Sequence, residues 1–235
     1  MTCICVLGMH RSGTSCLTGI MQKFGVELGD VFTENLYNKR GNRENSRIVD
    51  LNEALLSASN STWYSPTVVT NWNQEQILER DSIIEELRSR AAEFWGFKDT
   101  RALFTLNFWL DAIEQPKFIG TFRHPHRVAL SLNHRDKAPI DQCWDLWHIY
   151  NSRLLKLAKE HNFDLVNFDL PTDEYLEDTL NKLIKLGLDP DKIDAARGFF
   201  DTRLRNQTNT KVDNIRLPNH VMALYQELLD YHQSH

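Results

Sequence analysis

The most informative stretch of this sequence is Gly8-Met-His-Arg-Ser-Gly-Thr-Ser15. It follows a short apolar run at residues 3–7 and precedes a segment of helical character at residues 16–24. A strand, a glycine-bearing turn and a helix start in this order form a cradle for an anion, because backbone N–H groups converge there and the helix N-terminus adds positive charge. We therefore expect this loop to bind a phosphate or sulfate group. The alternative is a glycine-bearing turn that binds nothing.

The cation of the loop is displaced from its position in a Walker A motif. Two glycines separated by four residues have the spacing of a phosphate-binding loop, but Thr14 and Ser15 stand where that motif has Lys and Ser or Thr. The positive charge is instead carried by Arg11, inside the loop. Because the Walker A lysine is missing, the motif alone does not identify an ordinary ATP-binding loop, and this alternative stays open.

Length and composition indicate one α/β domain that spans residues 1–235. The net charge of −5 argues against a general nucleic-acid binder, which works by neutralising phosphates. No apolar run has the length of a membrane span, and we expect no signal peptide, because an apolar strand is predicted from residue 3. The four cysteines lack the spacing of a metal site or a disulfide framework. We expect a cytoplasmic protein with reduced cysteines and with no metal, nucleic-acid or membrane partner.

Three more short apolar runs predict strands at residues 94–97, 117–122 and 163–168. The first run, residues 3–7, is expected at the centre of the sheet. Helical patterns alternate with these strands at residues 16–24, 46–56, 74–93, 102–114, 126–133, 141–161, 173–186, 190–200 and 218–232. The alternation predicts a three-layer α/β sandwich with a central parallel sheet of about four to five strands, flanked by helices and similar to P-loop NTPases. Residues 57–73 mix polar and aromatic side chains, and we expect them to form an irregular segment outside the core.

Polar residues follow the ends of the predicted strands, where α/β sheets bind their ligands. They are Arg11 after the first strand, Lys98 with Asp99 after the second, and Arg123 after the third. Ser131 lies eight residues beyond Arg123 on a predicted helix. Arg123 offers a forked donor that suits a phosphate; the alternative is a pair with a local carboxylate.

The loop at residues 8–15 resembles the 5′-phosphosulfate loop of sulfotransferases that use 3′-phosphoadenosine 5′-phosphosulfate (PAPS). The Arg123–x7–Ser131 spacing resembles the segment by which these enzymes hold the 3′-phosphate. The resemblance implies an enzyme that moves a sulfuryl group from PAPS to an acceptor hydroxyl or amine without a metal ion. The acceptor would be a small molecule, a carbohydrate or a peptide. The cofactor-binding residues that it implies are His10, Arg11, Ser12, Gly13, Thr14, Ser15, Arg123, Ser131 and, in a short late motif, Arg205.

The resemblance also implies catalytic roles for Glu44, Arg11 and Lys98. Lys98-Asp99 resembles the Lys-Asp-Pro motif of bacterial and tyrosylprotein sulfotransferases, with Thr100 in place of proline, and Lys98 would stabilise the transferring charge. The alternative for Lys98 is an ion pair with Asp99 or another carboxylate. Glu44 lies in a stretch that resembles the one supplying the catalytic glutamate, and Asp99 is the alternative base.

The chain departs from the family pattern at two places. Phe168 stands near the position of a cofactor-contacting tyrosine of cytosolic members, and the late arginines Arg203 and Arg205 match only a short bacterial motif. Two other functions therefore stay open. One is a nucleotide kinase or NTPase of the same broad fold, and the other is a protein that binds a nucleotide without catalysis.

Overall fold

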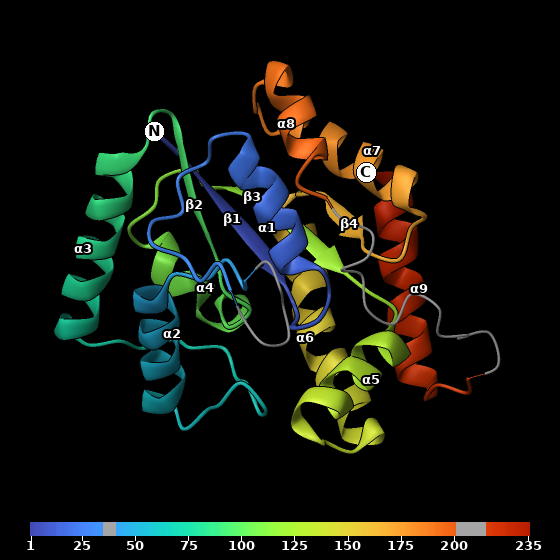
Figure 1. Cartoon of the computed structure of the whole chain (residues 1–235). Helices are drawn as coiled ribbons and strands as arrows, with labels where there is room; N and C mark the ends of the chain where they lie inside the picture. Colours follow the sequence, from blue (N-terminus) through green and yellow to red (C-terminus); the bar gives the residue numbers. More distant parts are fainter. Residues whose placement is uncertain (35–40, 201–214) are drawn as a thin grey trace.

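The computed structural model describes residues 1–34, 41–200 and 215–235, and four parallel strands form its centre (Figure 1). They are β1 (Thr2–Gly8), β2 (Phe94–Lys98), β3 (Lys117–Phe122) and β4 (Leu165–Asn167). Their order is β2-β1-β3-β4, so the first strand lies inside the sheet, as expected. The helices are α1 (Thr14–Lys23), α2 (Ser46–Ala58), α3 (Gln74–Arg90), α4 (Ala102–Leu110), α5 (Pro125–Asp136), α6 (Ile140–His161), α7 (Thr172–Lys185), α8 (Ile193–Arg197) and α9 (Asn219–Ser234). The predicted three-layer α/β architecture is confirmed, with four strands in the described sheet.

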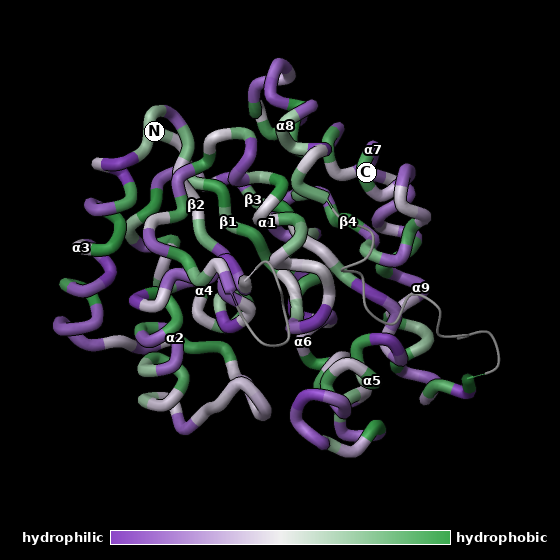
Figure 2. Tube along the Cα trace, in the orientation of Figure 1, coloured by the Kyte–Doolittle hydropathy of each residue, from purple (hydrophilic) through white to green (hydrophobic). Residues whose placement is uncertain are grey.

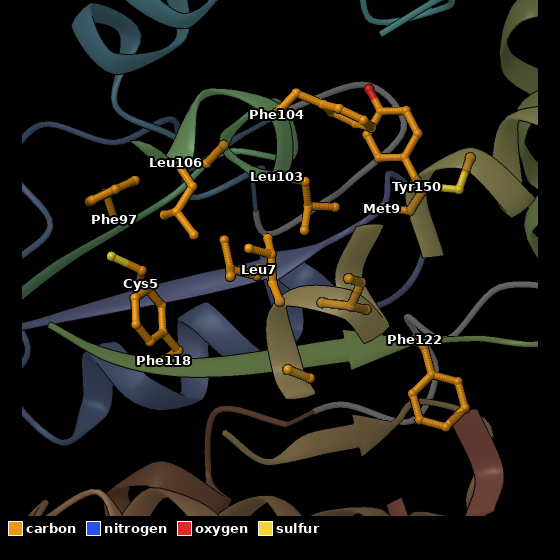
Figure 3. Close-up of a cluster of buried hydrophobic side chains, with 14 of the residues drawn as sticks. Cys5, Leu7, Met9, Phe97, Leu103, Phe104, Leu106, Phe118, Phe122 and Tyr150 are labelled. Carbon is orange, nitrogen blue, oxygen red and sulfur yellow. The ribbon is translucent and has the colours of Figure 1, made fainter. Parts of the chain in front are cut away.

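Alternate side chains of β1 enter two separate hydrophobic cores, because successive residues of a strand point to opposite faces. Cys5 and Leu7 pack into the larger core with residues of α2, α3, α4, α6 and α9. Figure 3 shows the part of this core around Cys5 and Leu7, with Phe97, Leu103 and Phe118 nearby. Ile4 and Val6 pack into the smaller core with α1, α7 and α8. Figure 2 shows hydrophobic residues along the central strands and mostly hydrophilic residues along α3 at the edge. A strand that is buried on both faces explains the continuous apolar run from which the sheet was predicted.

The register of the sheet brings the carboxyl ends of the strands to one edge. Val6 of β1 pairs with Lys98 of β2, and Gly8 pairs with Thr121 of β3. The loops that leave β1, β2 and β3 therefore emerge side by side. This edge is where the polar residues singled out in the sequence come together.

The segment between α2 and α3 is irregular, as expected, but the expectation that it lies outside the core is wrong for Val69. That side chain is fully buried, and its backbone N–H donates to the Phe104 carbonyl at 2.9 Å. The segment runs beside the carboxyl edge of the sheet, between α2 and α5 (Figure 1). Val69, together with Trp63 and Trp72, which pack against the larger core, thus attaches this irregular segment to the core.

Candidate active site

The loop between β1 and α1 has the backbone of an anion cradle. Arg11 and Gly13 both have positive φ, at 66° and 87°, and α1 begins at Thr14 without a side-chain cap. A Cβ atom on Gly13 would lie 2.2 Å from Cδ2 of Phe168, so only glycine fits this turn. The N–H groups of an uncapped first turn are the donors that bind anions at helix N-termini.

Two hydroxyl groups attach this loop to its surroundings. Thr121 Oγ1 donates to the Ser12 carbonyl at 2.9 Å, and Ser15 Oγ donates to the Asn42 carbonyl at 3.0 Å. Within α1, Thr18 Oγ1 donates to the Thr14 carbonyl at 2.7 Å. The hydroxyl of Ser12 is fully buried and has no hydrogen-bond partner within the described residues. A buried polar group of this kind normally has a partner, so the Ser12 hydroxyl indicates a place for a ligand atom.

Arg11 has a side-chain contact that the sequence did not predict. Its Nε donates to Ser131 Oγ at 2.7 Å, across 120 residues of chain, which joins the first loop to α5. Within the described ranges, no carboxylate forms an ion pair with the Arg11 guanidinium. Burial, followed by the charges of Arg135 and Arg123, lowers the pKa of Arg11 to about 10. Arg11 is thus a partly buried cation without an ion-pair partner in the part of the chain that the structure describes.

Arg123, by contrast, has a carboxylate partner at the end of β4. Its Nε lies 3.3 Å from Asp169 Oδ1, and the same oxygen lies 2.6 Å from Nη1 of Arg127. Asp169 Oδ2 accepts the His124 N–H at 2.6 Å. Burial opposes ionisation of Asp169, but Arg123, the His124 N–H and Arg127 outweigh it and hold the pKa of this carboxyl below its usual range. The local-carboxylate alternative for Arg123 is therefore present in the structure, although Arg127 takes the shorter contact.

Lys98 and Glu44 form a buried ion pair. Lys98 Nζ lies 2.6 Å from Glu44 Oε1, and the two side chains are 3% and 11% exposed. Glu44 directly precedes Asn45, whose side chain caps α2 by accepting the Arg47 N–H. The N-terminal approach to α2 thereby delivers the carboxylate to the end of β2. The structure brings together two of the three residues to which the sequence assigned catalytic roles.

Asp99 belongs to a separate buried network. Its carboxylate is fully buried, accepts from Asn52 Nδ2 at 2.8 Å and pairs with Arg101 at 2.9 Å. Burial raises the pKa of Asp99, the Arg101 charge opposes this rise, and the Glu44 charge adds to it. This network connects α2 to α4, and it favours Glu44 over Asp99 as the candidate base.

His10 connects the loop to the end of β2 and to the aromatic segment after α2. Its Nε2 lies 2.8 Å from Thr100 Oγ1, and its ring centroid lies 4.8 Å from that of Trp63. Burial, then the charges of Arg101, Arg135, Lys98 and Arg11, lower its pKa well below the ordinary value. Its surroundings therefore disfavour the protonated form of His10.

Sequence reasoning missed Asp169, Arg127 and Arg135. Asp169 follows a predicted strand, so the rule that identified Arg123 could also have found it. The two arginines lie inside a helix whose pattern gave no signal. Arg205 and Arg203 of the late motif lie outside the described residues. In the described part of the chain, no helix has both the length and the apolar character to cross a membrane, and no group of three or more His, Cys, Asp or Glu side chains is arranged to hold a metal ion.

Comparison with known proteins supports the fold. No protein-family model and no curated protein matches this sequence. Among solved structures, the chain is similar to the sulfotransferase domain of the olefin synthase of Synechococcus PCC 7002, with a TM-score of 0.60 and 16% identity. The match covers 97% of this chain and 94% of that domain. The α/β fold of this chain, with its loop between β1 and α1, is thus similar to that of a known sulfotransferase domain.

Proposed function

We propose that this chain is a sulfotransferase that moves the sulfuryl group of PAPS to an acceptor hydroxyl and releases adenosine 3′,5′-bisphosphate. One observation carries the proposal: Arg11, in the phosphate loop, has no carboxylate partner among the described residues. The neighbouring cations Lys98, Arg101, Arg123, Arg127 and Arg135 each have one. A partly buried guanidinium without a counter-ion, beside an uncapped helix N-terminus, fits a bound anion.

The residues present suit both anionic ends of PAPS. The Ser12 hydroxyl, the first-turn N–H groups of α1 and the Arg11 guanidinium would hold the phosphosulfate. Ser131 and Arg123 would hold the 3′-phosphate. Arg123 can turn toward that phosphate without leaving Asp169 unpaired, because Arg127 stays on the same oxygen at 2.6 Å.

The Lys98–Glu44 pair can couple proton removal to charge stabilisation. When bound, PAPS supplies the sulfuryl group, and negative charge develops on the leaving phosphate. A proton that passes from the acceptor hydroxyl to Glu44 Oε1 neutralises this carboxylate. The Lys98 ammonium, held at 2.6 Å before transfer, is then released to face the developing charge together with Arg11.

Ligand-induced stabilisation tests the cofactor class. We expect adenosine 3′,5′-bisphosphate at about 100 times its Kd to stabilise the fold by roughly 2.7 kcal/mol without Mg²⁺, seen as a rise in Tm. Arg11→Ala should lose this rise at the same concentration. Arg90→Ala is the matched control, because Arg90 lies on α3 in ion pairs with Asp30 and Glu86. Stabilisation by Mg·ATP alone would assign the chain to the kinase class.

Turnover is tested separately with PAPS and a panel of hydroxyl acceptors, by following release of the bisphosphate. Glu44→Gln should keep bisphosphate binding and lose most turnover. Binding without turnover on any acceptor by the unaltered protein would identify a non-catalytic nucleotide-binding protein.

A further inference from the structure

The segment that carries Glu44 is attached to α1 at two places. The Asn42 carbonyl accepts the Ser15 hydroxyl, in the first turn of α1, at 3.0 Å. Arg43 Nη1 donates to Gln22 Oε1, in the last turn of α1, at 2.8 Å. Ser15 and Gln22 are two helical turns apart, so they lie on the same face of α1. The two residues directly before Glu44 are therefore held along the helix whose N-terminus would bind the sulfuryl donor.

The Arg43 guanidinium has a second contact beyond α1. Its Cζ lies 5.3 Å from the ring centroid of Phe199, which follows α8, and this distance suits a cation–π interaction. Phe199 is buried and packs closely on Gly19 of α1, where an added Cβ atom would lie 2.2 Å from Phe199 Cε1. Arg43 is thus held between the side-chain oxygen of Gln22 and a ring that is itself fixed in a close fit.

The backbone at Arg43 adopts a conformation that residues with a side chain disfavour. Its φ of 56° lies in the left-handed region, where glycine and asparagine are the usual residues. The Arg43 N–H donates to the Phe32 carbonyl, and the Phe32 N–H donates to the Glu44 carbonyl, both at 3.1 Å. A residue in such a conformation persists only where its surroundings hold it. The contacts of the arginine side chain with Gln22 and Phe199 contribute to that hold.

Glu44 depends on its neighbours for its position. Lys98 is the last residue of β2, so the sheet fixes it, whereas Glu44 lies just before α2 and outside any helix or strand. A buried ion pair is favourable only when its two charges are held in good geometry. The 2.6 Å contact of Glu44 with Lys98 therefore requires that the segment before α2 be fixed by other means.

From these contacts, we infer that Arg43 is a positioning residue, which clamps the Glu44 segment onto α1 and so sets the Glu44 carboxylate against Lys98. This inference rests on the proposed sulfotransferase function, in which Glu44 accepts the proton of the acceptor. Arg43 acts through Glu44, so its loss should change proton removal and leave binding of the donor nucleotide unaltered.

The first test measures the interaction of Glu44 with Lys98 without any turnover. A double-mutant cycle with Lys98→Met and Glu44→Gln, followed by urea unfolding, gives the coupling free energy of the pair. The cycle is then repeated in an Arg43→Gly background. Glycine removes the side chain and accepts the left-handed backbone, so this variant should fold. We expect the coupling to fall to about half or less of its value in the unaltered protein. Undiminished coupling would overturn the inference.

The second test separates turnover from binding. kcat and the KM for PAPS are measured with the fastest acceptor of the hydroxyl panel, and the Kd of adenosine 3′,5′-bisphosphate is measured by calorimetry. Arg43→Gly should lower kcat at least about tenfold, because a base displaced by a fraction of an ångström loses its alignment. The KM for PAPS and the bisphosphate Kd should stay within about twofold. A residue that contributed to stability alone would leave the kcat of the folded enzyme unchanged.

Further variants assign the effect to the contacts of Arg43. Arg43→Lys should recover most of kcat, because it keeps a donor for Gln22 and a cation for the Phe199 ring. Gln22→Ala removes the acceptor on α1 and should lower kcat in the same direction as Arg43→Gly. Lys23→Ala is the matched control, since Lys23 is the next residue of α1 and is exposed; it should change neither kcat nor the coupling.

Failure of the inference is distinguishable from failure of the proposed function. An unchanged kcat in Arg43→Gly, or an equal loss of bisphosphate affinity, overturns the positioning role while the bisphosphate-induced rise in Tm of the unaltered protein persists. Absence of that rise in the unaltered protein overturns the sulfotransferase proposal, and the positioning role in catalysis with it.

Discussion

Replacing Arg11 with alanine should leave the ligand-free protein almost as stable as before, although it removes a partly buried arginine. The usual outcome for such a residue is a clear loss, because a buried arginine normally has a carboxylate that its removal leaves unpaired. Arg11 has no such partner among the described residues, and its Nε donates to the Ser131 hydroxyl instead. Its effect on stability should therefore differ from that of its neighbour Arg123.

The magnitude follows from the opposing contributions. Burial and the nearby cations lower the pKa of Arg11 to about 10, and both folded and unfolded states carry its charge at pH 7. The full cost of holding that charge, about 3 kcal/mol, then counts against folding, since each unit of pKa is worth about 1.4 kcal/mol. Loss of the bond to Ser131 removes about 1.5–3 kcal/mol, and loss of the aliphatic stem removes about 1 kcal/mol. The sum is near zero, to within about 1 kcal/mol.

Urea unfolding at pH 7, followed by tryptophan fluorescence and extrapolated to water, measures the free energy of unfolding. Arg123→Ala is the comparison: that side chain is 3% exposed and paired with Asp169, and its removal should cost about 3 kcal/mol. Both variants should bind adenosine 3′,5′-bisphosphate more weakly. A loss of more than about 2 kcal/mol for Arg11→Ala would refute the reasoning, because it would show that the folded protein balances this charge without a ligand.

Three more predictions concern the groups around the loop. Gly13→Ala should lower the free energy of unfolding by about 2–5 kcal/mol, because the added Cβ is strained in a left-handed backbone and clashes with Phe168. Gly198→Ala is the control: a Cβ there would lie 3.6 Å from its nearest neighbouring atom, so the same urea assay should show a change of less than about 1 kcal/mol. Equal effects of the two substitutions would contradict the turn geometry. Lys98→Met should lower the free energy of unfolding by about 3–5 kcal/mol, because it leaves Glu44 buried without its cation. Adding Glu44→Gln to this variant should recover at least about 1 kcal/mol of that free energy in a double-mutant cycle. If the effects of the two substitutions simply add, the buried ion pair is not supported. The pKa of Asp169 lies below its usual range, so the stability that this carboxylate contributes is complete above about pH 4 and disappears as the pH falls through the folded-state pKa. Asp169→Asn should therefore flatten the acidic part of a plot of unfolding free energy against pH. An unchanged plot would count against the ion pairs assigned to Asp169.

Much of the fold could be predicted because its signals are local. An apolar run, a glycine-bearing turn and a helical pattern follow one another at residues 3–24, and the same alternation recurs for β2, β3 and β4. Alternation of strands and helices implies parallel strands, and parallel strands place their carboxyl ends on one edge. The gathering of Arg11, Lys98 and Arg123 at that edge therefore followed from chain order alone. The burial of Val69 could not be predicted in this way, because a single apolar residue in an irregular segment carries no periodic signal.

The pairing of side chains was decided by tertiary structure. The sequence placed Lys98 next to Asp99, yet Lys98 pairs with Glu44, 54 residues away, because the turn of the chain into α2 delivers that carboxylate to the end of β2. Arg11 and Ser131 were assigned to opposite ends of one ligand, and packing of α5 beside the first loop brings them into contact. The identity of each residue determined what charge reaches the edge of the sheet. Which charge is balanced there, and which is left for a ligand, depends on distances of a few ångströms between distant segments, and the packing of helices against the sheet sets those distances.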